Sequence, residues 1–171
     1  MYARFITAAA ACITLLGCST PRPLGAEPDV AAVRQVVESF RVAILKKDKP
    51  SYMDLFFSSK PEEIGWQAVV DDARLEVIRR DRPQAIKARR IPTNNFVALI
   101  DSVVASKTTE EERISNVSVD TDGEVASASF DYVYLSDGRA TNWGREQWQL
   151  VRTERSWKIY SVVYTIRDPR P

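Results

Sequence analysis

The spacing of apolar residues predicts helices in the first part of the chain. One apolar stripe recurs at helical spacing and is formed by Val30, Val33, Val36, Val37, Phe40 and Ile44. Asp29 is a plausible N-cap for this helix, Lys46 and Lys47 suit its negative end, and Pro50 ends it. Residues 51–56 then predict a short second helix.

The middle of the chain is less regular. Residues 64–70 are a candidate strand. Asp71 or Asp72 is suited to cap a following helix, and Asn94 or Asn95 to open another one whose apolar residues begin at Phe96.

From Arg113 onward the pattern changes to strands separated by turns. The expected strands lie at about residues 113–119, 125–135, 141–152 and 157–166. Gly123 and Gly138 lie in the first two turns, and a polar turn follows at 153–156. This spacing predicts an antiparallel meander.

Both faces of the expected strands are rather apolar. In 125–135, one alternating set contains Phe130 and Tyr132, and the other contains Val133 and Leu135. A sheet with one solvated face would alternate more cleanly. We therefore expect one face to pack on the helices, and the other is a candidate surface for a homodimer.

This order of elements resembles the nuclear transport factor 2-like, or SnoaL-like, superfamily. The local similarity is greatest at the end, in EQWQLV at 146–151 and WKIYSVVY at 157–164. The resemblance covers about residues 30–166 and implies an α+β, cone-shaped fold, with N-terminal helices packed on a curved antiparallel sheet. Members include isomerases, cyclases, dehydratases, an epoxide hydrolase and many non-catalytic binders, so this fold does not assign a function.

The N-terminus has the pattern of an export signal. Arg4 is followed by the uncharged run 5–17, which is shorter than the roughly 20 apolar residues of a membrane-spanning helix. Leu15-Leu16-Gly17-Cys18 resembles the lipobox of bacterial lipoproteins, in which the cysteine receives the lipid. We therefore predict a signal peptide at 1–17, lipidation at Cys18, a flexible tether at 18–28 and one domain at 29–168.

Cleavage after Ala26 is the competing interpretation, which would discard Cys18. With lipidation, the protein is exported and anchored to a membrane, and Ser19 after the cysteine favours the outer membrane facing the periplasm. Without it, the protein is soluble in the periplasm or secreted.

Composition narrows the chemistry. The chain has 24 basic and 23 acidic residues, and removing the signal with Arg4 leaves 23 of each, so no nucleic-acid partner is expected. Cys12 and Cys18 are the only cysteines, so the domain has no disulfide. The absence of histidine excludes Ser-His-Asp sites, Cys-His sites and histidine metal ligands, and no metal or cofactor is expected. Acid–base chemistry would have to use Asp, Glu, Tyr or Lys.

The resemblance implies a pocket at the open end of the cone, between the concave sheet and the helices. Its candidate lining residues are Trp66, Phe96, Tyr132, Tyr134, Trp143, Trp148 and Tyr164. The alternative is that these rings fill the core.

An isomerase-type site needs a carboxylate and a donor in an apolar cavity. Glu146 and Asp131 are candidates for the acid or base. Asp131 and Tyr132 are adjacent in a strand and point to opposite faces, so Glu146 is the better candidate. The alternative for Glu146 is a surface ion pair with Arg145 or Arg152. No positions match a catalytic motif.

Three functional hypotheses follow. The first is a non-catalytic cell-envelope protein whose domain binds a small apolar ligand or a protein partner. The second is an isomerase, cyclase or hydrolase that uses carboxylate and tyrosine on a small hydrophobic substrate, and it predicts a buried carboxyl group with a raised pKa inside the pocket. The third is a structural or accessory role.

Overall fold

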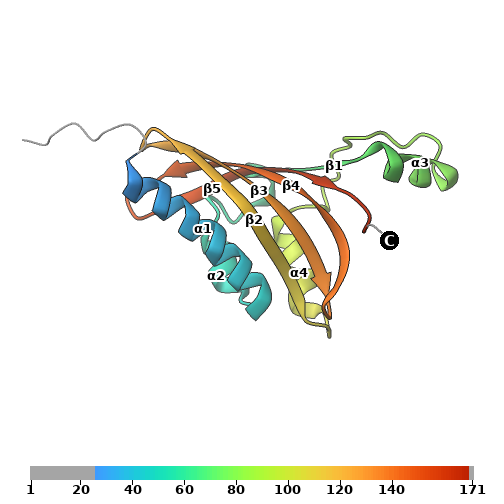
Figure 1. The fold of residues 1–171 in the computed structure, drawn as a ribbon, viewed down its shortest axis with the longest axis horizontal. Helices are drawn as coiled ribbons and strands as arrows, with labels where there is room; N and C mark the ends of the chain where they lie inside the picture. Colours follow the sequence, from blue (N-terminus) through green and yellow to red (C-terminus); the bar gives the residue numbers. More distant parts are fainter. Residues whose placement is uncertain (1–25, 170–171) are drawn as a thin grey trace, which may run out of the picture.

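The computed structural model describes residues 26–169. The predicted signal peptide, Cys18 and all but the end of the predicted tether lie outside these residues. Its α-helices are α1 (Glu27–Lys46), α2 (Lys49–Asp54), α3 (Asp72–Asp81) and α4 (Phe96–Ala105). Figure 1 shows α1, α2 and α4 on one side of a curved sheet, while α3 projects beyond one end of it.

The sheet has five strands in the order β1-β5-β4-β3-β2. Their bounds are β1 Gly65–Val70, β2 Glu110–Thr121, β3 Val125–Ser136, β4 Arg139–Arg152 and β5 Trp157–Ile166. Strands β2 to β5 form the expected antiparallel meander. β1 pairs in parallel with β5, so the whole sheet is mixed. The α+β architecture of helices packed on a curved sheet is confirmed.

The core lies between α1 and the concave face of the sheet. The apolar stripe of α1 is buried from Val33 to Ile44, and Phe40 packs against Trp148 of β4 with ring centroids 4.9 Å apart. Phe130 of β3 packs on the other side of Trp148, also at 4.9 Å. The apolar face of α1, set by its helical period, thus packs on the apolar face of the strands, set by their twofold period, and the two form one layer.

The start of α1 differs from the expectation. Ala26, not Asp29, occupies the N-cap position, because Pro28 fits the first turn, where its missing N–H is not needed. Asp29 is buried in that turn, and its Oδ1 lies 3.4 Å from Nη1 of Arg152. Its carboxylate therefore joins the helix to the sheet.

The other helix ends are capped locally. α1 ends at Lys46 because Lys47 adopts a left-handed conformation, and Pro50 lies in the first turn of α2 instead of ending α1. Asp48 caps α2 by accepting from the backbone N–H of Ser51. Asp71 caps α3 and Asn95 caps α4, as two of the expected alternatives.

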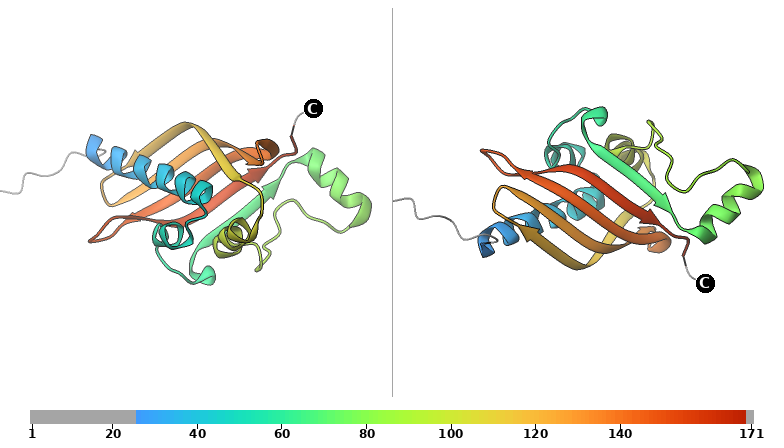
Figure 2. Two further views of the ribbon diagram at one scale, coloured as in Figure 1. Left: turned by 90° about the horizontal axis from the view of Figure 1, so that it is seen from below. Right: turned by 90° about the horizontal axis from the view of Figure 1, so that it is seen from above.

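Within residues 26–169, no helix covers the convex face of the sheet, as the right view of Figure 2 shows. Val125, Val133, Tyr160 and Val163 are exposed apolar residues of its strands. A homodimer through this face stays a prediction, and light scattering at several concentrations tests it: a strict monomer would contradict it.

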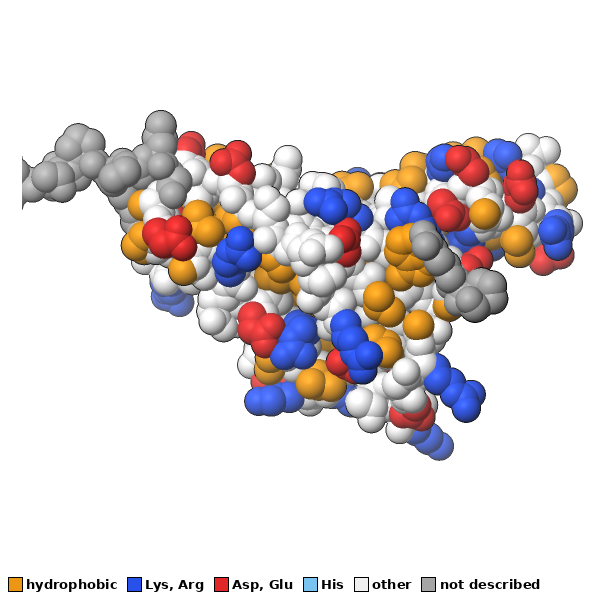
Figure 3. Space-filling model, viewed as in Figure 1, with side chains coloured by type: hydrophobic (Ala, Val, Ile, Leu, Met, Phe, Trp, Pro, Cys, Tyr) orange, Lys and Arg blue, Asp and Glu red, His pale blue; other side chains and the backbone are white. Residues whose placement is uncertain are grey.

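The arm around α3 carries mixed charge at its surface, with acidic and basic side chains interspersed in Figure 3. Arg74 pairs with Asp168 at 2.6 Å, and Lys87 pairs with Asp72 at 2.6 Å. The many basic residues of this segment are therefore partly neutralised within the described chain.

Candidate functional site

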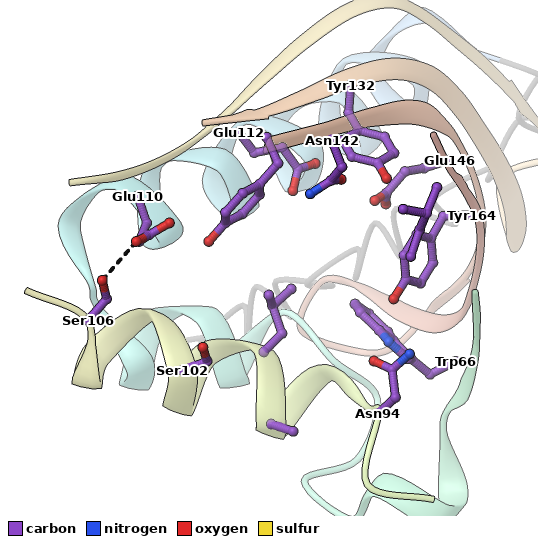
Figure 4. A pocket seen from close by; sticks show the side chains of 14 residues that line it. Trp66, Asn94, Ser102, Ser106, Glu110, Glu112, Tyr132, Asn142, Glu146 and Tyr164 are labelled. Atoms are coloured by element: carbon purple, nitrogen blue, oxygen red, sulfur yellow. Dashed lines mark hydrogen bonds between the residues drawn. The ribbon is translucent and has the colours of Figure 1, made fainter. Parts of the chain in front are cut away.

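A cavity of about 420 Å³ lies between the concave face of the sheet and α4. Side chains from all five strands of the sheet and from α4 line it, and Figure 4 shows Trp66, Glu112 and Tyr164 among those that point into it. The lining residues are Trp66, Asn94, Ala98, Leu99, Ser102, Ser106, Glu110, Glu112, Tyr132, Tyr134, Asn142, Glu146, Tyr164 and Ile166.

Strand register brings the polar side chains of this wall together. Tyr134 of β3 lies opposite Glu112 of β2 on one side and Asn142 of β4 on the other. Further along β4, Glu146 lies opposite Tyr164 of β5. Because residues that pair across neighbouring strands point to the same face, all five face α4.

Gly144 lets β5 approach this wall closely. A Cβ at this position would lie 1.9 Å from the carbonyl oxygen of Thr165, so only glycine fits. That carbonyl accepts a hydrogen bond of 2.9 Å from the Tyr132 hydroxyl. This hydrogen bond fixes the Tyr132 ring on the cavity wall. Because the hydroxyl proton is donated to Thr165, it is not available to a bound molecule.

Glu146 is a buried carboxyl group that faces the cavity. Glu146 is only 5 % exposed, and its Oε2 accepts a hydrogen bond of 2.5 Å from Nε1 of Trp148. Burial raises the pKa of Glu146 from 4.5 to about 7, against the lowering effect of the Trp148 hydrogen bond. Both its protonated and its ionised form are therefore populated near neutral pH.

Glu112 is a second buried carboxyl group on the same wall, 3 % exposed. Its Oε1 is buried and has no hydrogen-bond partner. Burial and the negative charge of Glu146 hold the pKa of Glu112 well above its ordinary value. Two buried carboxylates without a positive partner would repel each other, so the pair does not carry two charges at neutral pH.

Glu110 behaves differently because hydroxyl groups surround it. Its Oε1 accepts from Ser106 at 2.8 Å, from Thr108 at 2.5 Å and from Ser136 at 3.1 Å. Burial disfavours its charge, but these hydrogen bonds outweigh that effect and lower the pKa of Glu110. Figure 4 shows its bond to Ser106, which ties the end of α4 to β2. No group of acidic side chains within residues 26–169 is arranged to hold a metal ion.

Four of the seven expected aromatic residues line the cavity: Trp66, Tyr132, Tyr134 and Tyr164. Phe96 does not, because it is fully buried and stacks on Phe56 with centroids 4.1 Å apart. Trp148 also lies in the core, where it touches the cavity only through its hydrogen bond to Glu146.

Trp143 and Asp131 lie away from the cavity. Trp143 pairs with Val133 across the strands, and Arg167 stacks over its ring at 5.0 Å from the centroid. Asp131 accepts a hydrogen bond from Nη1 of Arg145 at 3.0 Å. Both are one position out of phase with the cavity-facing residues, so the strand places them on the convex side.

Glu110 and Glu112 are wall residues that the sequence analysis did not include. The expected strand began at residue 113, whereas β2 begins at Glu110. Extending that strand by one pair would have placed Glu112 on the face of Ile114, which packs against the core. No comparable pattern in the sequence indicated that Asn94, Asn142 and the residues of α4 would line the cavity.

The comparisons with known proteins identify the fold. No protein-family model and no curated protein sequence matches the chain. A structure from Nostoc punctiforme, a protein of unknown function with a cystatin-like fold, matches with a TM-score of 0.58 at 11% identity, covering 88% of this chain and 98% of that one. A candidate scytalone dehydratase from Novosphingobium aromaticivorans has a TM-score of 0.58 at 10% identity, with 84% and 89% covered.

A nuclear transport factor 2-like protein with a cystatin-like fold, also from Novosphingobium aromaticivorans, has a TM-score of 0.55 at 15% identity, with 84% of each chain covered. At such low identity these likenesses establish the architecture and leave the activity open. The described domain has the nuclear transport factor 2-like, cystatin-like fold.

Proposed function

We propose that the domain binds a small, mostly apolar organic molecule in the cavity between its sheet and α4. The observation that carries this proposal is the cavity itself: about 420 Å³, walled by four aromatic side chains, with three buried carboxyl groups in its lining. Ligand sites are commonly cavities of about 300–1,000 Å³ with apolar walls and a few placed polar groups.

The two sides of the cavity offer different contacts. Trp66 and Tyr164 meet edge to face at 5.5 Å and, with Leu99 of α4, supply apolar surface. Asn94 and Asn142 add neutral hydrogen-bonding groups to the lining. A ligand with an apolar body and one polar end fits this distribution.

Filling the cavity is expected to abolish binding. Ala98 of α4 lines it, so Ala98→Phe places a ring inside. Titration with the neutral fluorescent probe N-phenyl-1-naphthylamine should show an affinity at least about tenfold weaker than that of the unchanged protein, equivalent to roughly 1.4 kcal/mol.

Val104→Phe is the matched control, since Val104 lies on α4 but is exposed and does not line the cavity. It should bind the probe as the unchanged protein does. Equal affinity in both variants, or no binding by the unchanged protein, would contradict the proposal.

Acid–base catalysis on the bound molecule is a second candidate function. The specific observation in its favour is Glu146, whose burial in the cavity wall gives it a pKa of about 7. A carboxyl group with this pKa exchanges protons efficiently near neutral pH. Turnover of a bound compound that Glu146→Gln removes, without loss of probe binding, would support it; turnover unchanged in that variant would argue against it.

We also propose, from the sequence alone, that the chain is exported and anchored through lipid on Cys18. No helix within residues 26–169 is long and apolar enough to cross a membrane. Cys18→Ala should shift the protein from the membrane fraction to the soluble fraction of bacterial cells. An unchanged distribution would contradict lipid anchoring.

A further inference from the structure

We propose that the molecule bound in the cavity is an organic cation, a protonated amine or alkylammonium with an apolar body, held by Glu112, Glu146 and the aromatic wall. This inference rests on the proposed binding function and specifies its ligand class. Its starting observation is the charge of the wall: three carboxyl groups line the cavity, and no Lys or Arg is among the lining residues.

The free oxygen of Glu112 points to a missing donor. Buried carboxyl oxygens in folded proteins nearly always accept a hydrogen bond, and each exception needs an explanation. Oε1 of Glu112 has no partner, although Glu112 is 3 % exposed and Figure 4 shows its carboxyl group directed into the cavity. An N–H donor on a bound molecule would satisfy it.

The surroundings of the two carboxyl groups favour a positive ligand. The titratable groups facing them are Glu110 of β2, Tyr132 and Tyr134 of β3, Tyr164 of β5, and Tyr52 of α2, and each is neutral or acidic. Arg74 reaches Tyr132 only through its long-range field, as it does not line the cavity. Burying a negative charge costs free energy unless the charge is paired. No basic residue lines the cavity to pair with Glu112 or Glu146.

Basic side chains on the same strands are engaged elsewhere. Arg113 of β2 binds Glu111 at 3.0 Å, and Arg145 of β4 binds Asp131 at 3.0 Å, both on the convex side. The alternation of β2 and β4 thus separates these two arginines from the carboxyl groups of the cavity.

The aromatic wall suits the same ligand. Trp66, Tyr132, Tyr134 and Tyr164 line the same cavity as the carboxyl pair. Aromatic faces attract ammonium groups, most strongly where water is excluded. A cavity of about 420 Å³ also leaves room for an apolar body beside the charged end.

Three probes with one phenyl body test the charge directly. We would titrate the protein at neutral pH with 2-phenylethylamine, 2-phenylethanol and phenylacetate by calorimetry. The amine, positive at this pH, should bind at least about tenfold more tightly than the alcohol, and phenylacetate most weakly. Equal or tighter binding of the alcohol or of phenylacetate would overturn the inference.

The pH dependence gives an independent reading. The cation prefers the ionised pair, so its binding should release protons, and its affinity should rise with pH through about 7, where Glu146 loses its proton. The affinity for 2-phenylethanol should change little over the same range. An amine affinity that is flat or falls with rising pH would contradict the inference.

Substitutions distinguish the preference for a cation from ligand binding as such. Glu112→Gln and Glu146→Gln should each reduce the preference for amine over alcohol at least about tenfold while binding of N-phenyl-1-naphthylamine persists. Glu111→Gln is the control, since Glu111 pairs with Arg113 away from the cavity, and it should keep the preference. A preference unchanged in both cavity variants overturns the cation; failure of the unchanged protein to bind any of these compounds overturns the binding function. If the variants do not fold, the pH series on the unchanged protein decides.

Discussion

Raising the pH from about 5 to about 7.5 is expected to lower the free energy of unfolding by roughly 2 kcal/mol through Glu146 alone. Burial raises the pKa of this carboxyl group from 4.5 to about 7 in the folded protein. Between these values the folded state holds a proton that the unfolded state has released. Stability from this group is therefore greatest below about pH 4.5 and is lost as the pH rises toward 7.

The chain offers an unusually clean window for this measurement because it contains no histidine. Glu112, whose pKa is raised well above its ordinary value, acts in the same direction. Glu110 and Glu111 have lowered pKa values, so their contributions change mainly below the window. A fall in stability across the window thus reports on the buried pair.

Urea unfolding at a series of pH values measures the effect. Glu146→Gln keeps an acceptor for Trp148 but cannot ionise, so most of the pH dependence due to Glu146 should disappear. Asp131→Asn is the matched control, because Asp131 lies on the convex face in an exposed ion pair with Arg145 and should leave the slope unchanged. Stability that is constant or rises over this range would show that Glu146 is solvated.

Trp148→Ala is expected to cost about 3–5 kcal/mol of folding free energy, the usual range for removing a large buried aromatic ring. Trp148 is almost completely buried and packs edge to face between Phe40 of α1 and Phe130 of β3. Its loss also removes the hydrogen bond that favours ionised Glu146, so the pKa of Glu146 should rise further. Trp148 thus contributes both to the packing of the core and to the pKa of Glu146 in the cavity wall.

Chemical unfolding at acidic pH isolates the packing effect, because Glu146 is then protonated in the unchanged protein as well. Val163→Ala provides the comparison, since Val163 lies on β5 but is exposed on the convex face. It should cost less than about 1 kcal/mol. A Trp148→Ala loss no larger than this would contradict the packing described for the concave face.

The apolar periodicity predicted most of the fold. The stripe from Val33 to Ile44 and the four strands of the meander lie where the pattern placed them, except that β2 begins earlier, at Glu110. The parallel pairing of β1 was not visible in the pattern, because it depends on how the chain returns after α4. Asp29 was misplaced as a cap because a tertiary partner, Arg152, takes up its carboxylate.

The cavity was predicted less completely. Alternation indicates which face a side chain is on, but not how far along the strand the cavity extends. Trp148 shares the face of Glu146 yet lies deeper, in the core, and Trp143, an odd number of positions from Trp148, falls on the other face. Glu112 was missed because three successive glutamates are more typical of a surface than of a buried wall.

Carbon-13 NMR of the side-chain carboxyl groups of Glu112 and Glu146, followed through a pH titration with and without 2-phenylethylamine, shows whether the cavity buries these groups and binds a cation through them. Without the amine, the pair is expected to titrate well above the ordinary glutamate value, with Glu146 at about 7, and saturating amine should lower the midpoint of Glu146 by about one unit or more. Both carboxyl groups titrating near the ordinary value of about 4.5, with no response to the amine, would mean that the cavity neither buries these groups nor binds a cation through them.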